Sequence, residues 1–145
     1  GTFTQRFGIE EGKKLPETLI EFNLKDDEHD DPLISDEHIK VFKWANQLEI
    51  NEIKLKALSI NNHLTELFNS IDILLVDFKI EFGRTQSGNT KEIILADEIS
   101  PDSCRLWDKK SNEKLDKDRF RRNLGGLIEA YKEVATRLGI DLSSI

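Results

Sequence analysis

Hydrophobic residues recur along this chain at two different spacings, which predict a mixture of helices and strands. Over residues 49–69 the apolar positions are Ile50, Ile53, Ala57, Ile60, Leu64 and Leu67. Steps of three and four place them on one face, so we expect a long helix that packs against a core. A similar stripe over residues 117–138 predicts a closing helix, capped by Asp116 and ended by Gly139. The glycine pair at 125–126 inside this helix favours either a bend or close packing.

The N-terminal part of the chain carries weaker signals for shorter elements. Thr2–Phe7 forms a short amphipathic segment that Gly8 can end. Residues 19–24 alternate between apolar and polar side chains, which predicts a strand. After an acidic loop, Ser35 is a suitable N-cap for a helix that runs to about Ala45.

An alternating segment at residues 73–82 predicts a strand of the core. Its even positions are all apolar, namely Leu74, Val76, Phe78, Ile80 and Phe82. Its odd positions end in Asp77, Lys79 and Glu81, and side chains two apart in a strand point the same way. We therefore expect the even positions to face the core and the odd positions to carry three charges on the opposite face.

A second strand is predicted at residues 92–99, after a polar loop at 83–91 that is rich in Gly, Ser, Thr and Asn. A hairpin is the simplest connection between the two strands. If odd residues pair with odd, Asp97 joins the charged face, although the sequence does not determine that register. Together the elements predict an α+β fold, in which long helices pack on one face of an antiparallel sheet.

Composition and charge narrow the classes of function. The chain has 145 residues, of which 37% are hydrophobic and 34% charged, and this balance is typical of a soluble globular domain. Its formal charge of -7 argues against a nucleic-acid partner, because phosphate backbones are bound by clustered Lys and Arg. No run of about 18 apolar residues is present, so we expect no membrane span. The single cysteine, Cys104, cannot form an internal disulfide and fits a reducing cytoplasm.

The charged positions indicate phosphate chemistry. Carboxylates on neighbouring strands, such as Glu81 and Asp97, can hold one Mg²⁺, which prefers oxygen ligands. Lys79 can neutralise a transferring phosphoryl group or hold a substrate carboxylate, and Arg105 can bind a phosphate through two N–H groups. Charges that alternate along a strand are more often its solvent-facing side, and that interpretation stays open for the run from Asp77 to Glu81.

Several segments resemble, in the right order, the motifs of the phosphoribosylaminoimidazole-succinocarboxamide synthase (SAICAR synthetase) family. Residues 74–83 and 97–108 resemble its two signature segments, 114–122 and 125–131 resemble its closing helix, and 6–12 resemble the segment after its substrate-phosphate motif. The resemblance covers essentially the whole chain. It implies the second domain of the family fold and an ATP-dependent ligase of purine biosynthesis. That ligase joins L-aspartate to 5-aminoimidazole-4-carboxylate ribonucleotide, and an acyl phosphate is the expected intermediate.

The resemblance also implies the cofactors ATP and Mg²⁺, a cytoplasmic enzyme and a homodimer. The roles that it implies are catalysis for Asp77 and Lys79, metal binding for Glu81 and Asp97, and substrate binding for Thr2, Asp102 and Arg105. Thr2 stands where the family usually has a serine whose hydroxyl contacts the substrate phosphate. The proton acceptor for the aspartate amine is not identified, and Asp77 is the candidate.

The N-terminal, ATP-binding domain of the family has no counterpart among these residues, because we find no Gly-rich phosphate loop. We therefore expect residues 1–145 to form the substrate- and Mg²⁺-binding domain, and we expect this chain alone to be inactive. Two other functions stay open. An Asp-x-Lys strand before an acidic metal site also suits a small-molecule kinase of related architecture. A non-catalytic interaction module is the second alternative.

Overall fold

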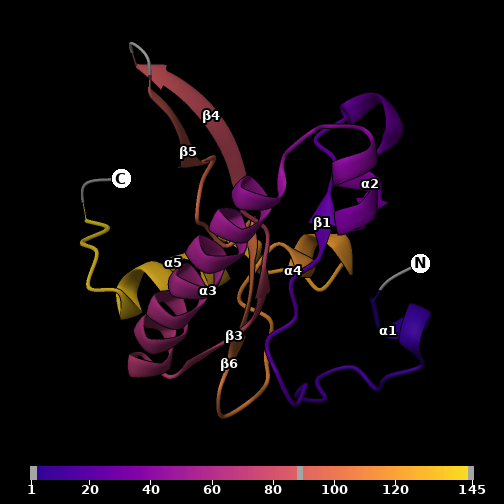
Figure 1. The fold of residues 1–145 in the computed structure, drawn as a ribbon. Helices are drawn as coiled ribbons and strands as arrows, with labels where there is room; N and C mark the ends of the chain where they lie inside the picture. The colour runs from indigo at the N-terminus through magenta and orange to yellow at the C-terminus, as the bar shows by residue number, and fades with distance from the viewer. Residues whose placement is uncertain (1–2, 88–89, 144–145) are drawn as a thin grey trace. The chain divides into compact units, whose positions relative to one another are not determined.

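The computed structural model describes residues 3–87 and 90–143, and the chain divides into two compact units, Gly1–Leu55 and Lys56–Ile145 (Figure 1). The described residues form helices and antiparallel strand pairs, which confirms the predicted α+β class. The longest helix, α3 (Gln47–Ser70), runs through the boundary between the units. None of the helices in the described residues has the length and apolar character needed to cross a membrane.

The first unit consists of short elements joined by turns. In chain order they are α1 (Phe3–Phe7), β1 (Phe22–Asn23), the 3₁₀ turn η1 (Asp27–His29), β2 (Leu33–Ile34) and α2 (Asp36–Val41). Gly8 follows α1 with a φ of 62°, as expected for a helix-ending glycine. The strand predicted at 19–24 is formed only at β1, because its antiparallel partner β2 is itself two residues long.

Ser35 caps α2 as the sequence predicts. Its hydroxyl accepts a hydrogen bond from the His38 N–H at 3.2 Å, and the His38 ring nitrogen Nδ1 accepts one from the Ser35 N–H at 3.2 Å. This reciprocal pair satisfies two N–H groups that the first turn leaves unpaired. The helix ends at Val41, earlier than the predicted Ala45, because Lys43 takes a left-handed conformation with a φ of 58°.

The long amphipathic helix is confirmed as α3. It begins two residues earlier than predicted, because two side chains cap its start. The Glu49 carboxylate accepts the Asn46 N–H at 2.9 Å, and the Asn46 side-chain oxygen accepts the Glu49 N–H at 3.0 Å. Ile50 is fully buried, as expected. At the other end the predicted Leu67 is 46% exposed, and Phe68 is buried in its place, since the stripe continues from Leu64 by a step of four.

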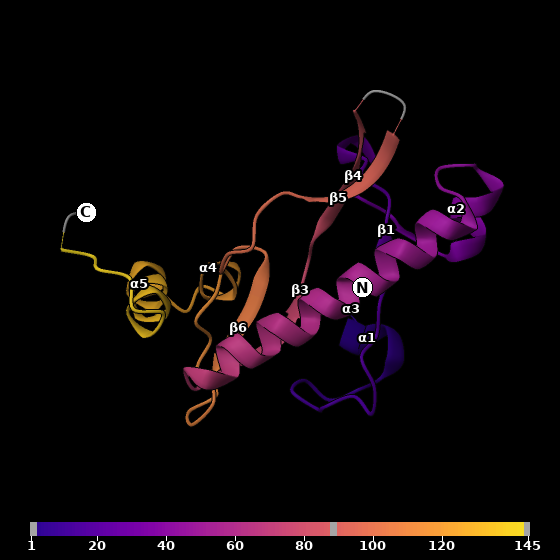
Figure 2. The same ribbon diagram turned by 60° about the vertical axis from the view of Figure 1, so that its left-hand side comes forward.

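The second unit contains two antiparallel strand pairs instead of the single predicted hairpin. β3 (Ile73–Phe78) pairs with β6 (Cys104–Asp108), and β4 (Glu81–Ser87) pairs with β5 (Thr90–Ala96). The strand predicted at 73–82 therefore breaks after Phe78. Most of the polar segment predicted as a loop at 83–91 lies in β4 and β5. Both views show this hairpin extending away from the β3–β6 pair (Figures 1 and 2).

The even positions of β3 do not all face the core, contrary to the prediction. Ile73 is fully buried, whereas Leu74 and Val76 are 43% and 39% exposed. The register with β6 shifts between Leu75 and Asp77, so one extra residue is accommodated there as a bulge. Because a bulge reverses the alternation, Phe78 returns to the side of Ile73, and it packs against the core.

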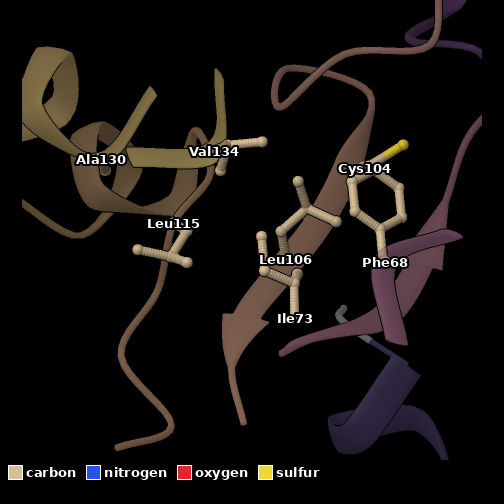
Figure 3. Close-up of a cluster of buried hydrophobic side chains, with 7 residues drawn as sticks. All are labelled: Phe68, Ile73, Cys104, Leu106, Leu115, Ala130 and Val134. Carbon is tan, nitrogen blue, oxygen red and sulfur yellow. The ribbon is translucent and has the colours of Figure 1, made fainter. Parts of the chain in front are cut away.

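The core of the second unit joins β3 and β6 to two helices. α5 (Leu127–Arg137) contributes Ala130 and Val134, and α3 contributes Phe68. These side chains meet Ile73 of β3 and Leu106 of β6 in one cluster, completed by Cys104 and Leu115 (Figure 3). Since both helices reach the same cluster, the prediction of helices on one face of the sheet is confirmed for this strand pair.

The closing segment is two helices, not the single one predicted at 117–138. α4 (Asp118–Arg121) is separated from α5 by a turn in which Gly125 and Gly126 take φ values of 69° and 64°. Residues with a side chain rarely adopt this left-handed conformation. The glycine pair therefore breaks the helix. Of the two predicted alternatives, a bend or close packing, the structure shows the bend. Gly139 ends α5 with a φ of 77°.

Candidate functional site

Six of the seven predicted site residues lie in the two connections that join the strand pairs, or beside them. We call this region, residues 77–81 and 97–105, the strand junction. On one side of it β3 passes into β4, and on the other side β5 passes into β6. The Lys79 N–H donates to the Ser103 carbonyl at 2.8 Å, so the two connections are held together through their backbones. Side chains far apart in the sequence are thus gathered in a small region.

The second connection is a turn built by its own polar groups. Asp97 leaves β5 with a φ of 68°, a conformation that aspartate tolerates better than most residues with a side chain. The Ser100 carbonyl then accepts from the N–H groups of Ser103 and Cys104, at 3.1 and 2.9 Å. The Ser103 hydroxyl donates to the Glu98 carbonyl at 3.1 Å. This turn positions Asp97 and Asp102 next to the start of β6.

Arg105 is held between two carboxylates. Its Nη1 donates to both oxygens of Asp77, at 2.8 and 3.1 Å, and its Nε donates to Asp118 Oδ2 at 3.0 Å. Asp77 faces Arg105 directly across the β3–β6 pair, and the bulge before Asp77 produces this register. Partial burial lowers the pKa of Arg105, but the charges of Asp77 and Asp118 raise it by more, so the guanidinium stays ionised.

Two buried aspartates, Asp116 and Asp118, lie near Arg105. Asp116 is fully buried and accepts the N–H groups of Leu106 and Asp118, each at 2.7 Å, which ties β6 to the start of α4. Burial raises the pKa of Asp116. Burial also acts to raise the pKa of Asp118, but hydrogen bonds from Arg121 and Arg105 outweigh it, so the net shift is downward.

Asp102 is anchored by the closing segment. The Tyr131 hydroxyl of α5 donates to Asp102 Oδ1, and the Lys117 ammonium lies 3.4 Å from Oδ2. The Tyr131 hydrogen bond is the largest influence that lowers the pKa of Asp102, and Lys117 adds to it. In turn, burial and this hydrogen bond raise the pKa of Tyr131. Asp102 is therefore an ionised carboxylate at neutral pH.

The predicted metal ligands lie at one end of the β4–β5 hairpin. Glu81 is in register with Ala96, and Asp97 follows Ala96 along the chain. Because successive side chains of a strand point to opposite faces, this register alone does not place the two predicted ligands on one face. The register pairs odd residues with even ones, contrary to the odd-with-odd pairing considered from the sequence. Glu81 Oε1 lies 3.1 Å from the Lys79 ammonium. No group of three or more His, Cys, Asp or Glu side chains among the described residues is placed to hold a metal.

Six of the seven predicted site residues therefore lie at the strand junction: Asp77, Lys79, Glu81, Asp97, Asp102 and Arg105. The seventh, Thr2, lies outside the described residues. Sequence reasoning missed Asp118, Lys117 and Tyr131, which contact Arg105 and Asp102. Lys117 and Asp118 lie in a run of alternating charges that is typical of an exposed helix face. Two aspartates two residues apart at a helix start were the available signal, since such side chains accept backbone N–H groups.

Comparison with known proteins identifies the family. The family model of SAICAR synthetase matches residues 1–138. A phosphoribosylaminoimidazole-succinocarboxamide synthase A from Bradyrhizobium diazoefficiens is 61% identical over 140 residues, which is 97% of this chain and 55% of the relative. A synthase from Phenylobacterium zucineum is 58% identical over the same length, covering 97% of this chain and 56% of the relative. The chain belongs to the SAICAR synthetase family.

Solved structures agree with this assignment. The crystal structure of the synthase from Ehrlichia chaffeensis superimposes with a TM-score of 0.92 at 49% identity, covering 97% of this chain and 60% of that one. A SAICAR synthetase in complex with ADP gives a TM-score of 0.88 at 46% identity, with 95% and 57% covered. The chain thus spans between half and two thirds of the length of these relatives.

Proposed function

We propose that this chain supplies the ribonucleotide- and magnesium-binding part of an ATP-dependent ligase of purine biosynthesis. The ligase joins L-aspartate to the carboxylate of 5-aminoimidazole-4-carboxylate ribonucleotide and converts ATP to ADP and phosphate. The observation that carries the proposal is the strand junction, where acidic and basic side chains meet in a chain of this family. A relative solved in complex with ADP supports the use of ATP.

The proposed reaction first activates the imidazole carboxylate. A carboxylate is a poor electrophile, so one of its oxygens attacks the γ-phosphorus of ATP, and the bond from that phosphorus to the leaving ADP oxygen breaks. The product is an acyl phosphate. The amine of aspartate then attacks the acyl carbon, the carbon–oxygen bond to phosphate breaks, and the nitrogen loses a proton. Asp77 stays the candidate acceptor for that proton.

Lys79 and Arg105 provide the positive charge that this reaction needs. In the proposal the Lys79 ammonium offsets negative charge that develops on the transferring phosphoryl group. The Lys79 side chain is more than half exposed, so an incoming phosphate can compete with Glu81 for it. Arg105 binds the phosphate of the ribonucleotide, because a guanidinium can donate two parallel N–H groups to a phosphate. Asp102 binds the same substrate at the turn.

The residues at the end of the β4–β5 hairpin fit a magnesium ion. Mg²⁺ is commonly held by one or two carboxylates and keeps several waters, which phosphate oxygens can replace. Glu81 and Asp97 would hold it, and the ion pair of Glu81 with the Lys79 ammonium at 3.1 Å supports Glu81 as a carboxylate that a cation can reach. When bound, the ion supplies charge neutralisation for the phosphate oxygens of ATP.

A chimeric enzyme tests the proposal. The chain is joined, in the order of the relative, to the part of the Bradyrhizobium protein that its match does not cover, and ADP and succinocarboxamide formation are measured. We expect both products only when ATP, L-aspartate and the imidazole carboxylate ribonucleotide are all present, and we expect the chain alone to be inactive. Phosphorylation of a hydroxyl substrate without any need for aspartate would instead support a kinase. A folded chimera that forms neither product would contradict the proposal.

A further inference from the structure

The carboxylate of Asp118 organises the basic side chains beside the strand junction. Its side chain is only 3% exposed. It accepts from Arg105 Nε at 3.0 Å and from Arg121 Nη1 at 2.9 Å, and Arg122 Nη2 lies 3.7 Å away. A buried carboxylate is unfavourable unless it is paired and hydrogen-bonded, so this arrangement requires the guanidinium groups to stay close.

Asp118 and Asp77 together determine the orientation of Arg105. A guanidinium is planar and has five N–H donors. Asp118 binds it at Nε and Asp77 binds it at Nη1. Two contacts at different nitrogens leave little freedom for the plane to rotate. Within the part of the chain that the structure describes, no side chain or carbonyl accepts from Nη2 of Arg105, so that group is oriented and available for a ligand.

Basic side chains are concentrated around Asp118. The guanidinium groups of Arg105, Arg121 and Arg122 lie 3.0, 2.9 and 3.7 Å from its carboxylate. The whole chain carries a formal charge of -7. The three arginine side chains are 42–46% exposed, so a phosphate monoester can reach their N–H donors.

We infer that Asp118 is a positioning residue for the ribonucleotide phosphate, acting by holding Arg105 and Arg121 in the orientation that binds it. The inference rests on the proposed function, because it uses Arg105 as the phosphate ligand. It goes further in assigning a role to a residue that does not touch the substrate. Removing Asp118 should weaken the contribution of the phosphate to binding and leave the contribution of the base and ribose unchanged.

Asp118→Asn is the informative substitution, and Asp108→Asn is its matched control. Asparagine has the same shape, but its NH₂ group cannot accept a hydrogen bond, so one arginine loses its partner. Asp108 is also a buried aspartate, and it accepts from Arg137 Nη2 at 2.7 Å, away from the strand junction. Both substitutions remove one buried acidic partner of an arginine, so they should lower stability in the same way.

Two measurements on the wild-type chain and both variants test the inference. The first is calorimetric titration with the imidazole carboxylate ribonucleotide and with its dephosphorylated nucleoside, whose affinity ratio isolates the phosphate. We expect Asp118→Asn to reduce this ratio about tenfold, since charge-assisted hydrogen bonds are worth about that factor. Asp108→Asn should leave it unchanged. The second is hydrogen exchange at the Arg105 Nε–H, which should be slow in the wild type and in Asp108→Asn, and fast in Asp118→Asn.

The outcomes separate this inference from the proposed function. Equal exchange rates at Arg105 in the wild type and in Asp118→Asn would overturn the positioning role. An affinity ratio that survives in Asp118→Asn would also overturn it and would leave the proposed function intact. A wild-type chain that binds ribonucleotide and nucleoside equally would contradict the proposed function, and with it the phosphate role of Asp118.

Discussion

Replacing Asp116 by alanine removes the acceptor that joins β6 to α4 in the second unit. The fully buried carboxylate accepts two backbone N–H groups, those of Leu106 and Asp118, each at 2.7 Å. Alanine leaves both groups buried without an acceptor, and each costs about 1–3 kcal/mol. Removing a buried negative charge offsets part of that loss. We therefore expect the free energy of unfolding to fall by about 2–4 kcal/mol, which is a large share of the stability of a small domain.

Urea unfolding followed by tryptophan fluorescence measures this loss. Trp107 is buried in the second unit, and Trp44 lies in the first, so a Trp44→Phe background reports the second unit alone. Asp116→Asn keeps one acceptor oxygen and should lose about half as much as the alanine variant. Asp141 accepts the Ser143 N–H at 2.9 Å in an exposed position, so Asp141→Ala should cost less than about 0.5 kcal/mol. An Asp116→Ala variant as stable as the Asp141→Ala control would refute the reasoning.

Three further predictions concern the strand junction and the closing segment. Asp97→Asn in the chimera should abolish product formation. The Tm should stay unchanged, because asparagine also tolerates a φ of 68°. Near-normal turnover would show that Asp97 is not a metal ligand. Tyr131→Phe should raise the pKa of Asp102 toward its ordinary 3.8, because the lowering hydrogen bond is lost. The lowered pKa of Asp102 adds to the free energy of unfolding at a pH above 3.8, and this contribution disappears as the pH falls through the pKa of the folded state. The free energy of unfolding of the variant should therefore decrease less on acidification than that of the wild type. A carboxyl ¹³C titration that gives the same pKa for Asp102 in both proteins would contradict this. Gly126→Ala should destabilise by about 1–2 kcal/mol, because its φ is 64° and a Cβ would meet Arg119 Nη2 at 3.3 Å. Gly83→Ala, where a Cβ has open space, should be close to neutral in the same thermal melt.

The helical parts of the fold could be predicted because their signals are local. The spacing of apolar residues identified α3, and Ser35 as a suitable N-cap identified the start of α2. The glycine pair before α5 marked a break, but the sequence left close packing open as well. Only the conformation of Gly125 and Gly126, both left-handed, decides between the two interpretations.

The strand pairing could not be predicted, because it depends on contacts between distant residues. Apolar residues occupy every even position from Leu74 to Phe82, so nothing in the pattern marks the end of β3 at Phe78 or the bulge at Leu75–Asp77. β4 and β5 contain polar residues and a glycine, since a hairpin that extends from the core has few apolar contacts to make. The polarity of residues 83–91 therefore predicted a loop, whereas the rest of β5 lies within the strand predicted at 92–99.

The site residues could be named from their resemblance to family motifs, but their partners could not. Asp77 and Arg105 are separated by 28 positions in the sequence, and only the bulged register of β3 with β6 brings them together. Asp118 lies in a run of alternating charges that is typical of an exposed helix surface. Its burial follows from the packing of α4 beneath β6 through Asp116, which no local pattern reveals.

Paramagnetic relaxation by Mn²⁺ tests the central claim most directly. Mn²⁺ accepts the same oxygen donors as Mg²⁺ and broadens the NMR signals of nearby nuclei. On titration of the chain we expect the amide signals of Glu81 and Asp97 to broaden first, and we expect Glu81→Gln or Asp97→Asn to prevent it. Broadening centred on the acidic loop at residues 26–31, with the signals of Glu81 and Asp97 unaffected, would contradict a metal site at the strand junction.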